Sequence, residues 1–567
     1  MSSSDTQYGP TLPISKEIHA QKYRAKGESF SEACARFAHA LSDDTQHFRK
    51  LYNILLGQRF LGGGRTQAAI GSTRRVTAFN CFVSGTIGDS MHDIMGKASE
   101  AAETMRLGGG IGYDFSTLRP RGDTIVSLDS KSSGPISFMG IFDAICQTIS
   151  SAGHRRGAQM GVLRVDHPDI EEFVRAKQNE DKFRGFNLSV GLTDEFMQAV
   201  EDKGMFDLTF DGRVYKRIDA VALWEEIMRA TWEWAEPGVL FIDQMNSQNN
   251  LQYCETIAAT NPCGEQPLPP YGACLLGSFN LTKYIQEDGE KFFDFAQLVQ
   301  DIPVVIRAMD NIHDNTFFPL PQQAEESVAK RRMGMGVTGL ANAGEVLGME
   351  YGSDEFLRFT ADVMGMIRDE SYRASALLAE EKGAFPLFDD RYLDSPFVKK
   401  LPSDIRELIA KHGIRNSHLL SVAPTGTISL SADNVSSGIE PVFAHYYDRT
   451  IQTFDGPIVE RVSDWAYREH GVKGKTAEEC SADEHLRVLA TAQQFVDSAC
   501  SKTINVNPET PWSDFKRIYM DAWKLGCKGV TTYNSSGKRF GILNKVSEEA
   551  EGQACYIDPA TGKKTCE

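Results

Sequence analysis

Residues 260–281 read TNPCGEQPLPPYGACLLGSFNL, and this stretch is the centre of what the sequence predicts. Asn261, Cys263 and Glu265 alternate in a segment bounded by prolines, and an extended backbone would point all three side chains the same way. A carboxylate can act as a general base, and a thiol can act as a nucleophile or carry a hydrogen atom. Taken alone, the triplet Asn-Pro-Cys also fits a tight turn with a buried cysteine.

On both sides of this stretch, from about residue 60 to residue 532, short β-rich runs alternate with longer amphipathic segments. Such alternation predicts an α/β protein with a parallel sheet and helices outside it. An apolar stripe with charged faces predicts helices over 219–234 and 356–382. The β-rich runs are GVLRV (161–165), FNLSVGLT (186–193), GVLFID (238–243), HLLSVAP (418–424) and GVTTY (529–533).

The two ends of the chain differ from this pattern. The first sixty residues have apolar positions at three- and four-residue spacing and predict a small helical cap. The last twenty or so residues are polar and short of large apolar side chains, so they predict a mobile tail. We therefore expect a helical region over 1–60, a catalytic α/β unit over 61–545 and a flexible tail over 546–567.

The composition limits the class of protein. A net charge of −17 argues against a basic surface that binds polymeric nucleic acid. The chain has no run of about 18 apolar residues, and its polar start does not resemble a signal peptide, so we expect a soluble, cytoplasmic protein outside the membrane. Eleven cysteines without metal-ligand CxxC pairs predict free thiols and no metal site.

After residue 60, nearly the whole chain resembles the catalytic (large) subunit of ribonucleotide reductases. NPCGEQPL followed by ACLLGSFNL resembles the active-site loop of that family, and the NPCGE form is most similar to the adenosylcobalamin-dependent class II enzymes. Eight further blocks occur in the order of the family. They are residues 79–90, 108–122, 132–144, 154–177, 423–430, 436–445, 501–506 and 526–533.

The resemblance implies a role for each residue of the active site. Cys263 is expected to form the thiyl radical that removes the 3′-hydrogen of the ribose. Cys81 and Cys274 are expected to supply two electrons as the 2′-hydroxyl leaves as water, and to close to a disulfide. Glu265 is expected to take the proton of the 3′-hydroxyl, and Asn261 to bind substrate hydroxyls.

A second implied site binds the substrate phosphate. Small and hydroxyl residues after the apolar run HLLSV allow backbone N–H groups to approach an anion, and a following helix would add its dipole. Taken alone, these residues also fit an ordinary turn. The resemblance places the substrate phosphate on Ala423, Pro424, Thr425, Gly426 and Thr427.

The resemblance also implies regulation by nucleotide effectors, (d)NTPs, at a homodimer interface. Asp89 matches the acid that binds the effector ribose, and Arg119 matches an arginine that binds the effector phosphate. The segment 178–186 matches the loop that relays effector identity to substrate choice. Without the family, Asp89 could be a helix N-cap and Arg119 a surface charge. The glycine cluster 108–112 lacks dinucleotide-binding spacing.

Cys555 and Cys566 are eleven residues apart in the predicted tail. In the family, such a pair re-reduces the active-site disulfide and is reduced by thioredoxin or glutaredoxin. The alternatives are two unrelated thiols, or zinc ligands, although two thiols without further Cys or His fall short of a four-ligand site. The remaining cysteines lack matching motifs and are expected to be packing residues: Cys34, Cys146, Cys254, Cys480, Cys500 and Cys527.

The radical source is inferred from the segment GCKGVTTYNSSGKR. Class I enzymes receive the radical from a ferritin-like subunit through two adjacent tyrosines, and Thr531 and Thr532 occupy those places here. The glycyl-radical motif of class III is also missing. We therefore expect adenosylcobalamin as the cofactor, although no DxHxxG cobalamin motif occurs in the chain. The implied fold is a ten-stranded α/β barrel of two antiparallel halves, each with five parallel strands, with Cys263 on a central loop.

Two alternatives remain. One is a class I large subunit, with no cofactor of its own and a metal cofactor in a ferritin-like partner. The other is a catalytically silent nucleotide-binding homologue, against which the retention of Cys81, Cys263 and Cys274 argues. About eighty residues precede Cys81, too few for the ATP-cone that controls overall activity in many relatives, so we expect control of specificity without dATP inhibition. The choice between diphosphate and triphosphate substrates stays open.

Overall fold

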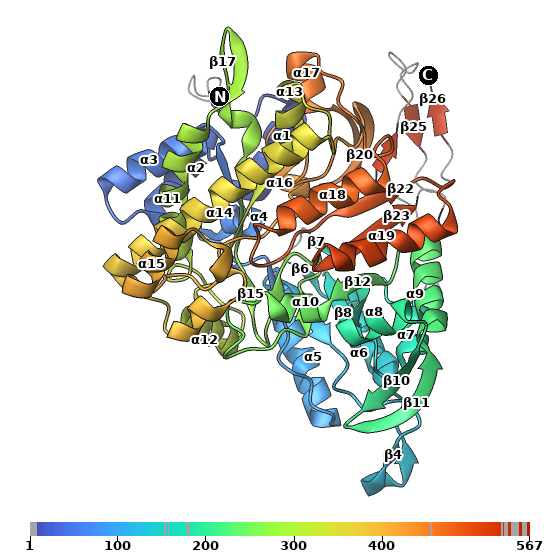
Figure 1. Cartoon of the computed structure of the whole chain (residues 1–567). Helices are drawn as coiled ribbons and strands as arrows, with labels where there is room; N and C mark the ends of the chain where they lie inside the picture. The colour runs from blue at the N-terminus through green and yellow to red at the C-terminus, as the bar shows by residue number, and fades with distance from the viewer. Residues whose placement is uncertain are drawn as a thin grey trace.

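The computed structural model is a mixed α/β structure with helices on the outside of its sheets (Figure 1). It describes residues 8–151, 155–156, 158–178, 182–453, 456–534, 537, 543–545, 555–557 and 564–566. The strands of the two main sheets are β1 (Phe60–Gly62), β2 (Cys81–Val83), β3 (Gly110–Asp114), β8 (Gln159–Arg164), β9 (Phe186–Leu192), β12 (Gly238–Phe241), β15 (Ala273–Cys274), β16 (Leu276–Asn280), β19 (Gly334–Thr338), β22 (Thr503–Val506) and β23 (Gly529–Asn534).

The larger sheet contains eight strands in the order β15-β2-β3-β8-β9-β12-β23-β22. Five neighbours, β2, β3, β8, β9 and β12, run parallel to one another. β23 is antiparallel to β12 and parallel to β22, and β15 is antiparallel to β2 at the opposite edge. The predicted α/β class with a mostly parallel sheet is therefore confirmed.

The smaller sheet has the order β1-β16-β19, with β16 and β19 parallel. Single parallel bridges continue its pairing toward the larger sheet, from Met335 to Leu420 and from Val422 to Cys500. β15 and β16 are separated by Leu275 alone, so the two sheets are also joined through the chain. The run 418–424 was predicted as a strand, and in the structure it contributes only these two bridges.

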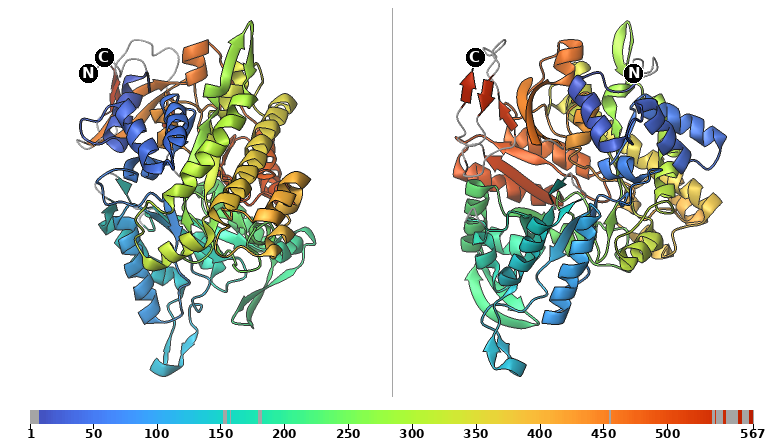
Figure 2. Two further views of the ribbon diagram at one scale, coloured as in Figure 1. Left: turned by 90° about the vertical axis from the view of Figure 1, so that its left-hand side faces the viewer. Right: turned by 180° about the vertical axis from the view of Figure 1, so that it is seen from behind.

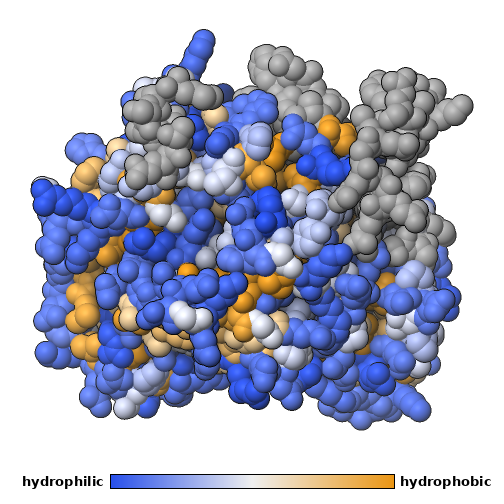
Figure 3. Space-filling view, turned by 90° about the horizontal axis from the view of Figure 1, so that it is seen from above, coloured by the Kyte–Doolittle hydropathy of each residue, from blue (hydrophilic) through white to orange (hydrophobic). Residues whose placement is uncertain are grey.

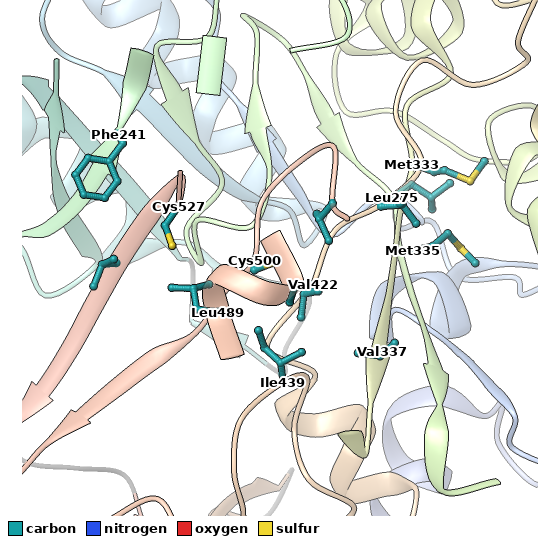
Figure 4. Close-up of a cluster of buried hydrophobic side chains, with 14 of the residues drawn as sticks. Phe241, Leu275, Met333, Met335, Val337, Val422, Ile439, Leu489, Cys500 and Cys527 are labelled. Atoms are coloured by element: carbon teal, nitrogen blue, oxygen red, sulfur yellow. The ribbon is translucent and has the colours of Figure 1, made fainter. Parts of the chain in front are cut away.

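An apolar cluster fills the space between these segments (Figure 4). Its side chains come from both sheets, from the bridging segments and from helix α18 (Ala482–Gln493), and all are buried. They belong to one buried cluster, so the two sheets share a single core. The labelled members are Phe241, Leu275, Met333, Met335, Val337, Val422, Ile439, Leu489, Cys500 and Cys527.

Both helices predicted from apolar stripes are present, as α9 (Ala220–Trp234) and α14 (Asp354–Lys382). The predicted N-terminal cap contains α1, α2 and α3, which lie beside α11 and α16 (Figure 2). The bounds of the other helices used below are α1 (Pro13–Tyr23), α2 (Phe30–Leu41), α3 (Thr45–Leu56), α5 (Met91–Arg106), α6 (Pro135–Thr148), α11 (Phe295–Ile312), α13 (Leu340–Val346), α16 (Gly426–Ser431) and α19 (Trp512–Lys524).

The surface seen from above is largely hydrophilic, with small scattered apolar patches (Figure 3). Among the helices of the described ranges, none is both long enough and apolar enough to span a bilayer. Most of the predicted tail lies outside the described residues. Its described parts are two short antiparallel strands, β25 (Cys555–Ile557) and β26 (Lys564–Cys566).

Gly112 of β3 lies directly against the backbone of Thr260, and a Cβ placed on it would come within 1.9 Å of the Thr260 carbonyl oxygen. We predict that Gly112→Ala lowers the free energy of unfolding by about 1–3 kcal/mol, because the added methyl forces these backbones apart. Gly140→Ala in α6 is the control, since a Cβ there meets nothing within 4 Å, and it should be neutral or stabilising. Urea denaturation measures the stability of both variants. Equal stabilities would contradict the close packing of Gly112 against the backbone of Thr260.

Candidate active site

Residues 259–268 form a hairpin, with β13 (Ala259–Thr260) antiparallel to β14 (Pro267–Leu268). The loop between these strands closes through its own backbone, because the Gly264 amide donates to the Asn261 carbonyl at 3.0 Å. Gly264 has φ +80°, which favours glycine. The Asn261 side chain stabilises the loop by accepting from the Gln266 amide at 3.0 Å.

The prediction of an extended backbone over this loop was wrong. The loop is a tight turn, so Asn261 and Glu265 are buried while Cys263 is exposed. The physical reason is the glycine between Cys263 and Glu265, which allows the chain to reverse direction. The thiol therefore lies at the tip of the turn, and the amide and carboxylate lie at its base.

Hydrogen bonds hold the turn against both main sheets. Asn187 of β9 donates its Nδ2 to the Pro262 carbonyl at 2.9 Å. From the other side, the Ala499 amide and the Ser421 hydroxyl each donate to the Glu265 carbonyl at 2.9 Å. The turn is thus fixed between the five parallel strands and the segments that continue the smaller sheet.

Cys81 and Cys274 face each other across the antiparallel pair β2 and β15. Residues directly opposite in such a pair have Cα atoms about 4.5–5.5 Å apart, within the range over which a disulfide can close. In the structure Cys274 is buried and Cys81 is half-buried. The register therefore permits one dithiol to become one disulfide without movement of the strands.

Burial raises the pKa of the Cys274 thiol well above its usual value, and the neighbouring groups of Cys81, Glu265 and Cys263 raise it further. A Cβ placed on Gly110 would lie 3.4 Å from the Cys81 sulfur and 3.0 Å from the ring of Pro262, next to Cys263. The structure thus brings together the cysteines and the carboxylate that the sequence predicted.

The predicted phosphate loop runs into α16, as the sequence analysis expected, because its last two residues, Gly426 and Thr427, are the first two of that helix. Thr425 has the left-handed φ of +51°. Its hydroxyl accepts from the Gly438 amide at 2.8 Å and lies 3.0 Å from the Thr338 hydroxyl. The side chain of Thr425 is therefore engaged within the protein, so at this position the backbone is the part that can approach an anion.

The two predicted effector residues meet, with Arg119 Nε 2.6 Å from Asp89 Oδ2. The Arg119 amide also donates to Asp89 Oδ1 at 3.2 Å. The N-cap of α5 is Ser90, which accepts from the Asp93 amide, so Asp89 is not the N-cap. The segment 178–186 lies only partly within the described residues.

The predicted tail cysteines are partners in one register, Cys555 opposite Cys566. Of the six cysteines expected to be packing residues, five are buried. Cys254 is exposed, so the prediction that it is a packing residue was wrong.

No group of three or more His, Cys, Asp or Glu side chains suited to hold a metal occurs in the described ranges. In β23, Thr532 is buried and its hydroxyl lies 2.8 Å from that of Tyr519.

The family model for the barrel domain of ribonucleotide reductase matches residues 79–533. The chain belongs to the ribonucleotide reductase family. The match contains the turn of residues 260–267, the opposed pair Cys81 and Cys274, the predicted phosphate loop and both predicted effector residues, so the geometry described above lies within the part of the chain that the family shares.

The relatives of the chain include proteins named vitamin B12-dependent ribonucleoside-diphosphate reductase. One, from Mycobacterium tuberculosis (strain CDC 1551 / Oshkosh), is 38% identical over 498 residues, which cover 82% of this chain and 69% of the relative. Another, from Thermoplasma acidophilum, is 36% identical over 501 residues, which cover 83% of this chain and 63% of the relative. The chain thus spans about two thirds of the length of these relatives.

Sequence reasoning missed residues that support the turn of residues 260–267. Asn187 anchors this turn at Pro262. The sequence feature that could have indicated it is an amide side chain within the otherwise apolar run 186–193. Gln266 is buried with both amide atoms unpartnered, beside Gly334, where a Cβ would lie 2.2 Å from its Nε2. The alternating glycines in GMGVTG were the signal for this close approach.

We predict that iodoacetamide alkylates Cys263 well before Cys274 in the native protein. The thiolate is the reactive form, and the buried Cys274 thiol has a raised pKa, whereas Cys263 is exposed. Mass spectrometry of timed samples measures the two rates, with urea-unfolded protein as the control in which both thiols react alike. Equal rates in the native protein would contradict the burial of Cys274.

Proposed function

We propose that the chain reduces ribonucleotides to 2′-deoxyribonucleotides by thiyl-radical chemistry with adenosylcobalamin as the radical source. The observation that carries this proposal is the register of β2 and β15, which sets Cys81 opposite Cys274 beside the turn of Cys263. The names of the relatives support vitamin B12 dependence and ribonucleoside diphosphates as substrates.

The residues of the site account for each part of the reaction. The Cys263 thiyl removes the 3′-hydrogen while Glu265 takes the proton of the 3′-hydroxyl. The 2′-hydroxyl leaves as water after receiving a proton, and Cys81 and Cys274 together supply two electrons and two protons. One of these protons leaves in the water and one hydrogen stays on C2′. Cys263 returns its hydrogen to C3′ and Glu265 returns its proton to the 3′-oxygen, so the net change at the protein is one dithiol oxidised to one disulfide.

The buried amides at the base of the turn suit the binding of ribose hydroxyls. Asn261 Nδ2 is buried without a hydrogen-bond partner, and so are both polar atoms of the Gln266 side chain. An unmet buried polar group costs about 1–3 kcal/mol, and a bound hydroxyl would remove that cost. This supports Asn261 as the residue that holds substrate.

The surroundings of Cys263 fit a large external cofactor. Cys263 is exposed, and a Cβ placed on the adjacent Gly264 meets nothing within 4 Å. Adenosylcobalamin supplies a radical by homolytic cleavage of its cobalt–carbon bond. Thr531 and Thr532, where a class I enzyme would have two adjacent tyrosines, support this source over a partner subunit.

We assign the substrate phosphate to the loop Ala423–Thr427 and the effector nucleotide to Asp89 and Arg119. Exposed apolar side chains are close to this pair in sequence: Met91 and Met95 follow Asp89 on α5, and Val126 follows Arg119. These side chains support a homodimer at this edge, because exposed apolar surface marks contacts between proteins.

We infer that the two main sheets together are the ten-stranded barrel of the family. Five parallel strands, β2 to β12, form one half. β23, β22, the bridged segment at 420–422, β19 and β16 form the other, and both junctions between the halves are antiparallel. The remaining divisions are the helical region 1–60 and the tail 546–567.

We assign Cys555 and Cys566 to re-reduction of the active-site disulfide, with thioredoxin or glutaredoxin as the external reductant. Their opposite positions on β25 and β26 support this role, because a dithiol needs both residues close together. The thiol state of the described cysteines suits a reducing compartment, and we place the reaction in the cytoplasm.

The test is anaerobic reduction of ribonucleoside diphosphates and triphosphates with dithiothreitol and deoxynucleotide effectors, with and without adenosylcobalamin. We predict deoxynucleotide formation only with the cobalamin, and its loss by at least a thousandfold in Cys263→Ser, because an alcohol cannot carry the radical. Cys254→Ser, which replaces another exposed cysteine, is the matched control and should keep full activity. Activity that needs a ferritin-like partner instead would move the chain to class I.

A further inference from the structure

Thr425 adopts a backbone conformation that few residues other than glycine adopt. Its φ is +51°, in the left-handed region, where a β-branched side chain is strained. It is also buried and lies at the junction between the predicted phosphate loop and α16. Since strain of this kind persists only where surrounding contacts enforce it, the contacts of Thr425 identify what holds the loop.

Two threonine hydroxyls form a directed chain of hydrogen bonds. The Gly438 amide donates to Thr425 Oγ1 at 2.8 Å, and Thr425 Oγ1 lies 3.0 Å from Thr338 Oγ1. Thr338 Oγ1 donates to the Ser436 carbonyl at 3.0 Å. A hydroxyl has one proton, so Thr338 gives its proton to Ser436, and Thr425 must then donate to Thr338.

The far end of this chain is fixed independently. The Ser436 amide donates to Asn342 Oδ1 at 2.7 Å, and Asn342 Nδ2 donates to Asp464 Oδ1 at 2.9 Å. Thr338 itself is the last residue of β19, in parallel register with Asn280 of β16. All of these side chains are buried. The Thr425 hydroxyl is therefore hydrogen-bonded to a residue of the smaller sheet that is itself fixed in place.

We propose that Thr338 is a positioning residue for phosphate binding, in that its hydroxyl holds Thr425 left-handed and thereby shapes the loop Ala423–Thr427. This inference rests on the proposed assignment of the substrate phosphate to that loop. The only proton of the Thr425 hydroxyl is directed at Thr338, so at this position the loop offers its backbone to the phosphate, and the shape of the loop affects the affinity.

The first experiment compares Thr338→Val with Thr338→Ser. Valine keeps the shape and removes the hydroxyl, whereas serine keeps the hydroxyl. We expect Thr338→Val to weaken CDP binding, measured by calorimetry without cobalamin, about five- to tenfold, the usual effect of one buried hydrogen bond. KM should rise by the same factor with kcat nearly unchanged. Thr338→Ser should restore the CDP affinity and the KM of the wild type.

Thr360→Val is the matched control, because Thr360 is equally buried and its hydroxyl donates only to the Phe356 carbonyl within α14. It should bind CDP like the wild type. Equal CDP affinities of Thr338→Val and Thr360→Val would overturn the positioning role.

If Thr338→Val fails to fold, the comparison of Thr425→Gly with Thr425→Ala replaces it. Glycine adopts the left-handed conformation without support, so the Thr425→Gly protein should bind CDP more tightly than the Thr425→Ala protein. The reverse order would also overturn the proposal.

A third variant, Thr427→Glu, tests the assignment of the substrate phosphate to this loop separately from the role of Thr338. A glutamate in the first turn of α16 suits the helix but repels a phosphate on the loop. If Thr427→Glu leaves CDP binding unchanged, the phosphate binds elsewhere and the proposed site fails. If it weakens binding while Thr338→Val does not, the site stands and the positioning role of Thr338 is wrong.

Discussion

The register between β2 and β15 is the constraint on which the proposed chemistry depends. It places Cys81 opposite Cys274 at an antiparallel junction. A slip of one residue would send one of the two thiols to the other face of the sheet, because side chains alternate along a strand. The same junction leads through Leu275 into β16, so the dithiol and the second sheet are fixed by one continuous segment.

The turn of residues 260–267, which holds the proposed catalytic Cys263, depends on that framework rather than on its own sequence alone. Its carbonyls are held by Asn187 on one side and by Ser421 and the Ala499 amide on the other, so both main sheets must be in place before Cys263 is positioned. Fixed positions are what radical chemistry requires, because hydrogen transfer between two groups needs them within contact distance. The unpartnered amide atoms of Asn261 and Gln266 indicate a site shaped for a ligand more polar than the protein core.

The local pattern of the sequence predicted the regular elements well. β8, β9, β12 and β23 lie where short apolar runs indicated strands, and α9 and α14 lie where apolar stripes indicated helices. The cysteines, Glu265 and the effector pair were predicted through the family resemblance, and the structure brings each set together.

What the sequence could not provide was conformation that depends on distant partners. The turn at Cys263 was predicted as extended, because glycine allows a reversal without requiring one. The segment 418–424 contributes two bridges, since its pairing depends on residues 335 and 500 far away in the chain. The hydroxyl chain from Thr425 to Ser436 joins three segments, none of which has a recognisable motif for it.

The most direct test of the account is a single turnover under anaerobic conditions without any external reductant, followed by quenching, alkylation and mass spectrometric mapping of disulfides. We predict one deoxynucleotide per disulfide formed. In the Cys555→Ser/Cys566→Ser protein, whose tail cannot exchange with the active-site disulfide, this disulfide should join Cys81 to Cys274. Deoxynucleotide formed while Cys81 and Cys274 remain free thiols, or a disulfide on another pair such as Cys500 and Cys527, would contradict it.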